Sequence, residues 1–342
     1  MKCSDILMPD LRPAESVTHR SLGMVPVVTP TTPPHLDEVL LLEEALAQNS
    51  LEVTETGPGG QVPFLKVINH GKQPVLILEG EELVGGKQNR VVNTSILVPA
   101  AAEVKIPVSC MEAGRWHYQP EHPLAEKFQA GEALFRARSR FVKKLTVTES
   151  LRANQGFRSN QGEVWREVDE SLHELGAASA TRDFRSARQR AEERMAEYLQ
   201  NLAPVENQVG AVFYGPRSLL GCELLGSAVL FQKAFLKILR SFAFEVVATD
   251  EPAPQQADGL AAWWSGVLEA PLETFPSPGA GEDCRLETET ALGSALVWQG
   301  SMVHLSCFPK AGETTRSGPT GGIRRLSASQ RRRSLDRRMK GE

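Results

Sequence analysis

The sequence contains no apolar run close to the roughly 18–20 residues that a membrane-spanning helix needs. Its first residues, MKCSDILMPDLRP, also lack the continuous apolar segment of a secretory signal peptide. We therefore expect a cytoplasmic protein without a membrane contact.

Cysteine pairs at metal-binding spacing are also lacking. The five cysteines are scattered singly, with no CxxC pair. An odd number of separate cysteines argues against a disulfide framework and against a structural zinc site, so we expect reduced thiols. The motifs HExxH, GxSxG and the P-loop are absent too, which leaves no standard hydrolase or nucleotide-binding signature.

The net charge of −4 is unevenly distributed. Residues 311–342 contain nine Arg/Lys and three Asp/Glu, a net +6, and the remainder holds 29 basic and 39 acidic residues, a net −10. The basic tail has little apolar content, which predicts disorder. An acidic body gives no reason to expect nucleic-acid binding, so nucleic acid would bind only through basic segments such as this tail.

The remaining 41% hydrophobic and 23% charged composition over 342 residues is that of an ordinary globular protein. We predict a flexible N-terminus over residues 1–16, one α+β domain over 17–310 and the disordered tail over 311–342. Short alternating runs such as LEVTET and VPFLKVIN predict mainly antiparallel sheets. We expect a helical segment over about 123–202, a further helix near 223–242, and a closing β-meander within CRLETETALGSALVWQGSMVHLSCF.

The most unusual segment is EGEELVGGKQNR, which lies between two apolar strand-like runs, VLIL and VVNTSILV. A ligand there would meet carboxylates, amides and a guanidinium, so the candidate ligand-binding residues are Glu79, Glu82, Gln88, Asn89 and Arg90. Glu79 and Glu81 have the same strand parity, which makes them candidates to hold a metal ion or share a proton. Arg90 could bind one of these carboxylates or a phosphate. A solvated turn and a buried ion-pair network are the structural alternatives.

A second polar cluster follows the strand-like IPVSC and continues as MEAGRWHY. Cys110 beside arginine and histidine is a candidate nucleophile, although a buried cysteine is more often an apolar filler. Glu112 and Glu81 are candidate acid–base groups, and Arg115 and Trp116 are candidate ligand contacts. His304 in MVHLSCF is a third candidate, although a single histidine inside a strand is usually a core or surface residue without a functional role.

Two of these segments resemble the hallmarks of a known family. LEVTET, VPFLKVIN and PVLILEGEELVGGKQNRVVNTSILVPA, followed by KIPVSCMEAGRW, are similar to the bacterial ARG and rhodanese-phosphatase-superfamily-associated protein domain family, where ARG denotes ADP-ribosylglycohydrolase. Weaker similarity extends over about residues 17–308. The resemblance implies one continuous α+β domain and an association with ADP-ribose- or phosphate-handling proteins. It assigns no reaction, catalytic residue or cofactor.

Three functions are compatible with these observations. In the first, the protein binds a small anionic ligand, such as a nucleotide or ADP-ribose, and both polar clusters converge on one concavity. In the second, it is a non-enzymatic protein partner or scaffold in which Glu81 or Glu82 pairs with Arg90, and Glu112 pairs with Arg115, as structural locks. In the third, the basic stretch 127–158, with eight Lys/Arg and two Asp/Glu, binds nucleic acid together with the tail. No residue spacing decides whether the protein is an enzyme.

Overall fold

The computed structural model describes residues 1–57, 63–115, 127–254 and 258–310, and Met1–Lys310 form one compact unit. Within the described residues, helices are combined with strands that pair almost entirely antiparallel, which confirms the predicted α+β class. The predicted disordered tail and Trp116 lie outside the described residues.

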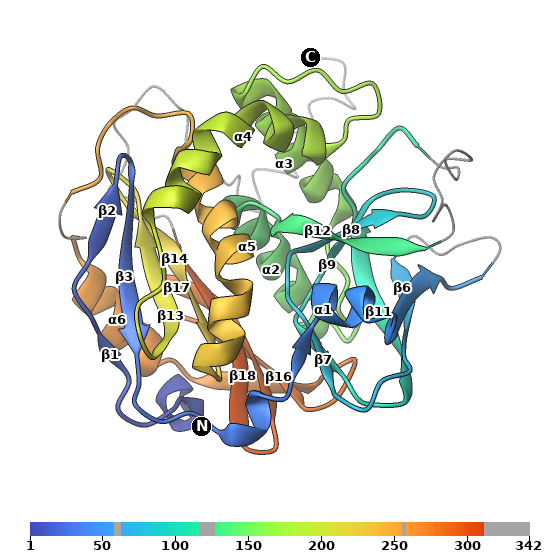
Figure 1. Ribbon diagram of the computed structural model, residues 1–342, viewed down its shortest axis with the longest axis horizontal. Helices are drawn as coiled ribbons and strands as arrows, with labels where there is room; N and C mark the ends of the chain where they lie inside the picture. Colours follow the sequence, from blue (N-terminus) through green and yellow to red (C-terminus); the bar gives the residue numbers. More distant parts are fainter. Residues whose placement is uncertain (58–62, 116–126, 255–257, 311–342) are drawn as a thin grey trace, which may run out of the picture. The chain divides into compact units, whose positions relative to one another are not determined.

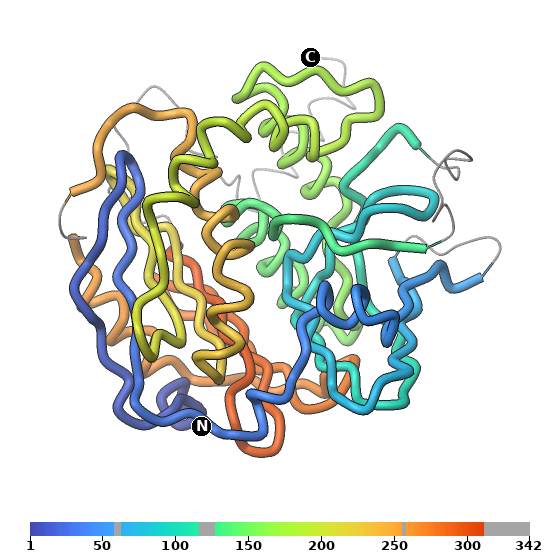
Figure 2. Tube along the Cα trace, viewed as in Figure 1, coloured from blue at the N-terminus to red at the C-terminus, as the bar shows by residue number. Residues whose placement is uncertain are grey.

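The larger sheet has nine strands, which come from both the N-terminal and the C-terminal parts of Met1–Lys310 (Figure 1). Its order is β1 (Arg12–Pro13), β3 (Leu22–Val28), β13 (Gln208–Tyr214), β14 (Leu219–Leu225), β18 (Ser301–Pro309), β17 (Ala291–Trp298), β16 (Glu282–Glu287) and β15 (Leu272–Pro276), and β2 (Val17–His19) pairs with β3. Strands β15 to β18 are successive antiparallel neighbours, as the predicted closing meander requires. In Figure 2 the first strands, in blue, run beside β13, in yellow-green.

The first hundred residues form most of two smaller sheets. One contains β10 (Ile96–Val98), β7 (Val75–Ile77) and β4 (Leu40–Leu41). The other contains β12 (Phe128–Leu134), β8 (Glu81–Gly85), β9 (Arg90–Val92), β11 (Ala102–Cys110), β6 (Phe64–Asn69) and β5 (Leu51–Glu55). In β5 and β6 buried and half-buried residues alternate, as expected of strands with one face on a core.

The helices differ from the sequence prediction at two places. The structure contains α1 (Leu42–Ala47), α2 (Ala137–Arg152), α3 (Gln161–Glu174), α4 (Phe184–Asn201), α5 (Ala228–Val246) and α6 (Leu260–Leu268), with short 3-10 helices η1 (Cys3–Ile6) and η2 (Pro34–Leu36). The predicted helical segment 123–202 therefore includes strand β12, which pairs with β8. The helix expected near 223–242 begins later, because residues 219–225 pair with β13 and β18 and Ser227 caps α5 by accepting from the amides of Val229 and Leu230.

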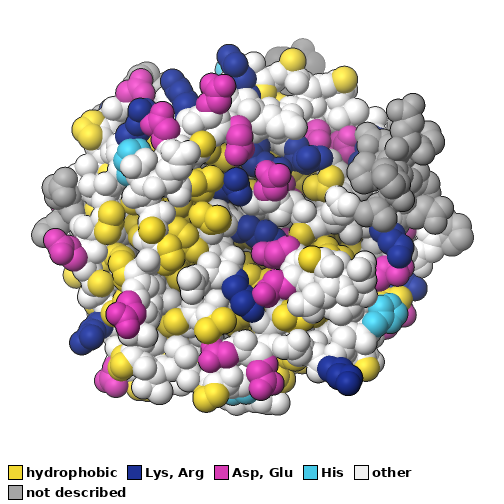
Figure 3. Space-filling model, in the orientation of Figure 1, with side chains coloured by type: hydrophobic (Ala, Val, Ile, Leu, Met, Phe, Trp, Pro, Cys, Tyr) yellow, Lys and Arg dark blue, Asp and Glu magenta, His cyan; other side chains and the backbone are white. Residues whose placement is uncertain are grey.

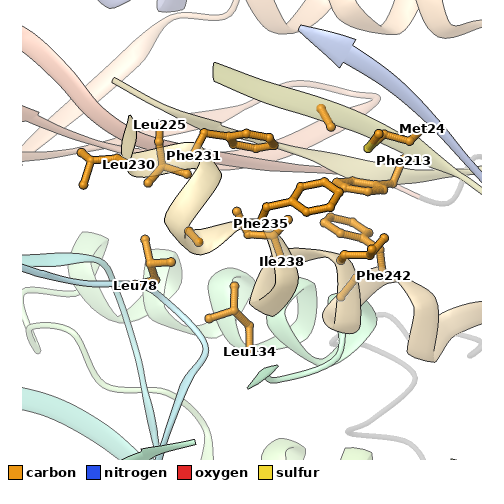
Figure 4. Packing of buried hydrophobic residues seen from close by; sticks show 14 of the residues in the cluster. Met24, Leu78, Leu134, Phe213, Leu225, Leu230, Phe231, Phe235, Ile238 and Phe242 are labelled. Carbon is orange, nitrogen blue, oxygen red and sulfur yellow. The ribbon is translucent and has the colours of Figure 1, made fainter. Parts of the chain in front are cut away.

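Helix α5 lies between the nine-stranded sheet and β12 (Figure 1). Its side chains Phe231, Phe235, Ile238 and Phe242 pack against Phe213 of β13 and against residues of the smaller-sheet side (Figure 4). The rings of Phe213 and Phe242 stack with centroids 4.2 Å apart. This apolar layer joins the nine-stranded sheet to the side that holds the smaller sheets. The polar contacts described below lie beside it.

The N-terminal residues are packed rather than free. The sequence predicts flexibility over residues 1–16, yet Cys3 is fully buried and β1 pairs with β3. The Cys3 amide also donates to the Ala270 carbonyl at 2.9 Å. No helix within the described ranges is long and apolar enough to cross a membrane.

Candidate functional site

The two polar segments singled out in the sequence meet in space. Strand β11 delivers Cys110 opposite Arg90 of β9. Gln88 Nε2 donates to the Glu112 carbonyl at 2.8 Å, and the Asn89 amide donates to Glu112 Oε2 at 3.2 Å. We name this group the arginine corner. Its members are Glu55, Gln88, Asn89, Arg90, Cys110, Glu112 and Arg115.

Arg115 closes the arginine corner. Its Nε donates to both Glu112 carboxylate oxygens, at 3.0 and 2.9 Å, and its Nη1 donates to the Gly86 carbonyl at 2.7 Å. Only about 5% of Arg115 and 4% of Glu112 is exposed to solvent. The pairing of Glu112 with Arg115 that the lock hypothesis requires is therefore present.

Arg90 has different partners from those the lock hypothesis assigns to it. Its Nη1 donates to Gln88 Oε1 at 2.8 Å and to Cys110 Sγ at 2.7 Å, and its Nη2 lies 3.8 Å from Glu55 Oε1. Burial raises the pKa of Cys110 despite the nearby Arg90 charge. Desolvation outweighs the single cation here, so Arg90 does not activate the Cys110 thiol by lowering its pKa, and the role of Cys110 as a nucleophile stays a prediction.

The three glutamates of EGEEL diverge. Their ion pairs are Glu79 with Lys144, Glu81 with Lys237 of α5, and Glu82 with Arg188 of α4. Each carboxylate has its own cation, so Glu79 and Glu81 do not converge on a shared ion. The predicted pairing of Glu81 or Glu82 with Arg90 is wrong, because these two carboxylates pair with Lys237 and Arg188 instead. No group of three or more potential metal ligands occurs among the residues that the structure describes.

Glycines permit this close packing around β8. Gly85 has φ +134°, and a Cβ atom there would lie 2.3 Å from the Lys127 carbonyl oxygen. Gly80 has φ +82°, and its Cβ would meet the Arg140 side chain at 2.8 Å. Both positions therefore need glycine for conformation and for space. This accounts for glycines within the polar segment.

Asp183 is a member of this region that its sequence position did not reveal. It caps α4 by accepting from the Arg185 amide at 3.1 Å, and its other oxygen accepts from Asn89 Nδ2 at 3.1 Å. Burial raises the pKa of Asp183 to about 6, and the Glu112 charge adds to this effect. The sequence indicates the helix start but not the contact with Asn89, which depends on the tertiary fold.

A second and larger polar group lies where α2 meets the nine-stranded sheet. We name it the polar seam, and all of its residues are at most 6% exposed. Surface Lys/Arg and Asp/Glu side chains are intermingled on the face in Figure 3, whereas the charges of the seam are inside the protein. The members of the seam are Glu79, Thr94, Ser95, Arg140, Lys143, Lys144, Glu223, Asp283, Arg285, Ser294, His304 and Ser306.

Helix α2 supplies three cations to the seam. Lys144 Nζ contacts the Glu79 carboxylate and donates to the hydroxyls of Ser294 and, at 2.9 Å, Ser306. Burial raises the pKa of Glu79, but the charges on Lys144 and the two other α2 cations outweigh it, so the net shift is downward. Glu79 is therefore ionised at neutral pH.

Lys143 is less well compensated than Lys144. Its ammonium donates to the Val92 carbonyl, and among the described residues it forms no ion pair. Burial lowers the pKa of Lys143 to about 7; Glu79 opposes this shift, and Arg140, Lys144 and Arg285 add to it. A lysine that titrates near neutrality inside a protein is a feature found more often at functional sites than elsewhere.

One end of the seam contains Arg285 of β16. Arg285 Nε donates to Asp283 Oδ1 at 2.5 Å, and Nη2 donates to Thr94 Oγ1 at 2.9 Å. The Phe157 ring lies over the guanidinium at 5.7 Å, and Asn93 Nδ2 donates to the Phe157 carbonyl at 3.0 Å. The loop between α2 and α3 therefore covers this end of the seam.

Most of the seam was not predicted from sequence. Arg140, Lys143 and Lys144 share the buried stripe of α2 with Val147, a spacing that could have indicated a buried basic face. His304, a lone histidine that the sequence makes a third candidate, lies in the seam in contact with two other members.

The basic stretch 127–158 is largely occupied by internal contacts. Four of its eight cations, Arg136, Arg140, Lys143 and Lys144, are at most 4% exposed. Buried cations cannot contact a nucleic-acid backbone, so the part of the third hypothesis that uses these four side chains is wrong.

Fold and polar contacts together define an α+β protein with two buried ionic networks, one at a strand corner and one beneath a helix. The family described as ARG and Rhodanese-Phosphatase-superfamily-associated Protein domain (ARPP-1) matches residues 10–308, and the chain belongs to this family. No curated protein and no solved structure matches the chain.

Proposed function

We propose that this protein binds a small anionic ligand of the nucleotide or ADP-ribose class, and that the ligand's phosphates contact the polar seam rather than the arginine corner. The family name links these proteins to ADP-ribosylglycohydrolases and to rhodanese-phosphatases, which handle ADP-ribose and phosphate groups. That association supports the class of ligand and leaves the reaction open.

The charge of the seam carries the proposal. Arg140 Nε and Arg285 Nη1 are buried donors for which the described residues supply no acceptor. Buried charge without full compensation is costly, and an anion in contact with these donors would offset that cost. When Lys143 is protonated, the seam as a whole places four cations, Arg140, Lys143, Lys144 and Arg285, against three carboxylates, Glu79, Glu223 and Asp283.

The arginine corner is less suited to a ligand. Arg115 donates to Glu112 and to backbone carbonyls, and Arg90 donates to Gln88 and Cys110. A ligand phosphate would have to displace these contacts. We assign this corner to holding β8, β9 and β11 together.

Access to the seam would begin at the loop between α2 and α3. The Phe157 ring of this loop covers Arg285, and the Phe157 carbonyl is held by Asn93. Residues 152–156, which precede Phe157, are exposed, so displacing this segment together with Phe157 would uncover Arg285. Arg285 is thus the first phosphate contact in this proposal.

The test is a calorimetric titration with ADP-ribose, AMP and pyrophosphate, paired with thermal melting. Wild type and Arg115→Met should both bind ADP-ribose and melt at higher temperature with it, whereas Arg285→Met and Lys143→Met should lose at least ~10-fold in affinity. Arg115→Met is the matched control, because it also removes a buried arginine. Equal binding by all four proteins, or binding by none, would refute the proposal.

A scaffold function is the second candidate, favoured by the closure of the arginine corner. Glu112 with Arg115 and, nearby, Glu82 with Arg188 are buried pairs that lock strands and helices together. In that case a protein partner from the ADP-ribose- or phosphate-handling classes would bind the exterior, and no small anion would change the melting temperature.

A further inference from the structure

Three seam residues from distant parts of the chain form a continuous hydrogen-bonded relay. Ser95 follows β9, Glu223 lies on β14 and His304 lies on β18. Ser95 Oγ is 2.6 Å from His304 Nδ1, and His304 Nε2 is 2.6 Å from Glu223 Oε2. The exposed fraction is 5% for Ser95, 1% for His304 and 0% for Glu223.

The protons of this relay can be assigned from its partners. A carboxylate only accepts, so His304 Nε2 carries a hydrogen and donates to Glu223. In the neutral imidazole Nδ1 is then an acceptor. Ser95 Oγ accepts from the Glu79 amide at 2.9 Å, so its own hydrogen is available to donate to His304. A base that receives the serine proton is therefore already in contact with it.

Neighbouring contacts hold the relay in place. Arg140 Nη2 contacts the other oxygen of Glu223, which fixes the carboxylate against His304. Thr94, next to Ser95 in the chain, donates to Asp283 Oδ2 at 2.6 Å and accepts from Arg285. These are the features of a nucleophile, a base and a residue that orients the base.

We infer that Ser95, His304 and Glu223 hydrolyse a carboxylic ester whose alcohol part carries phosphate groups. This inference rests on the proposed function, because the seam cations would hold those phosphates. The Phe157 ring covers Arg285, Arg285 donates to Thr94, and Ser95 is the next residue in the chain. The phosphates and the ester group would thus bind to adjacent parts of the seam.

The reaction proceeds in two balanced steps. Ser95 Oγ attacks the ester carbonyl carbon while His304 Nδ1 takes the hydroxyl proton, and the C–O bond to the alcohol breaks as His304 returns that proton to the leaving oxygen. Water then attacks the acyl-serine, His304 takes a proton from the water, and the released Ser95 Oγ recovers it. The products are the free carboxylic acid and the phosphate-bearing alcohol, with no oxidant or reductant required.

The experiment uses the full chain, O-acetyl-ADP-ribose and a fluorophosphonate probe. Acetate release should occur with wild type, and the probe should label Ser95 in a peptide digest. Ser95→Ala and His304→Gln should lose at least ~100-fold in rate. Ser21→Ala is the matched control, because Ser21 is also buried and donates to a backbone carbonyl, that of Thr249, at 3.0 Å; it should keep the wild-type rate.

Glu223 is a positioning residue and needs a separate readout. Glu223→Gln should lower kcat more than it raises KM, since Glu223 orients His304 directly and affects the phosphate contacts only through Arg140. Ser95→Cys, which keeps a nucleophile of similar size, covers the case in which Ser95→Ala does not fold; it should form a stable acetyl-thioester. Two results together would overturn the inference. The first is that Ser95→Ala, His304→Gln and Glu223→Gln lose activity only to the extent that they lose folding, and the second is that a folded Ser95→Cys forms no thioester.

The two proposals can fail separately. If ADP-ribose binds but O-acetyl-ADP-ribose is not hydrolysed and the probe does not label Ser95, the relay is refuted and the binding proposal stands. If ADP-ribose does not bind but 4-nitrophenyl acetate is hydrolysed in a Ser95-dependent reaction, the relay stands and the ligand class is refuted. Persistent hydrolysis in folded Ser95→Ala would refute the assignment of the nucleophile.

Discussion

Replacing Lys143 by methionine should stabilise the protein at neutral pH. Lys143 is fully buried, its hydrogen bond goes to the Val92 carbonyl, and burial lowers its pKa from 10.5 to about 7. Methionine is of similar length and carries no charge to desolvate. The variant therefore removes an unfavourable contribution to the free energy of unfolding and loses one hydrogen bond.

The sign and size follow from proton linkage. Between about pH 7 and pH 10.5 the unfolded chain keeps the Lys143 proton and the folded protein does not, so this residue makes wild-type stability rise by about 1.4 kcal/mol per pH unit. The penalty is largest below pH 7, on the order of 5 kcal/mol. Subtracting about 1 kcal/mol for the lost hydrogen bond leaves the variant more stable by roughly 3 kcal/mol at pH 7. The two proteins should be about equally stable near pH 10.

Urea unfolding at several pH values between about 7 and 10 measures this difference. Lys72→Met is the control, because Lys72 is exposed, and its unfolding free energy should run parallel to wild type across the range. Parallel curves for wild type and Lys143→Met, or a variant less stable than wild type at neutral pH, would refute a buried, uncompensated ammonium at this position.

Three further predictions concern other parts of the structure. Arg115→Met should lower the free energy of unfolding by about 3 kcal/mol, because it leaves the buried Glu112 carboxylate without its cation; urea unfolding measures this. Gly85→Ala should cost about 2 kcal/mol or more, since its φ is +134° and its Cβ would meet the Lys127 carbonyl, and thermal melting measures this. All five cysteines are buried, so a thiol-specific colorimetric reagent should react with them only after unfolding.

Each of these three predictions would be contradicted by a particular result. An Arg115→Met loss below about 0.5 kcal/mol would mean that the pair with Glu112 is solvated. Gly57→Ala is the control for Gly85→Ala, because no atom lies within 4 Å of its Cβ position; equal losses would contradict the steric argument. Rapid reaction of any thiol in the native protein would contradict the burial of that cysteine.

The parts of the fold with regular apolar patterns could be predicted from sequence. LEVTE alternates and forms β5, and the spacing of Val164, Val168 and Leu172 gives the buried stripe of α3. FQAGEAL was the exception: its alanine, glutamate and leucine favour a helix, but pairing with β8 makes it β12. Tertiary contacts there outweighed the local preference.

The site could be predicted only in part. The sequence shows that EGEELVGGKQNR and SCMEAGR are unusual, and the structure brings them together at the arginine corner. Their partners are hidden, because Lys237, Arg188 and Glu55 lie far away in the chain and nothing local marks them as buried. The polar seam was missed for the same reason: lysines in a basic helix have the appearance of solvent-exposed residues, and His304 is isolated in sequence.

The position of β18 has a consequence for how the protein is made. This strand ends at Pro309 yet lies between β14 and β17, in the interior of the nine-stranded sheet. While the ribosome is still synthesising the residues before Ser301, β14 has an open edge, and Glu223 has no histidine beside it. Pairings between strands far apart in the sequence form slowly, and open strand edges invite association with other chains. Newly made molecules must therefore wait for β18 before their central sheet can close.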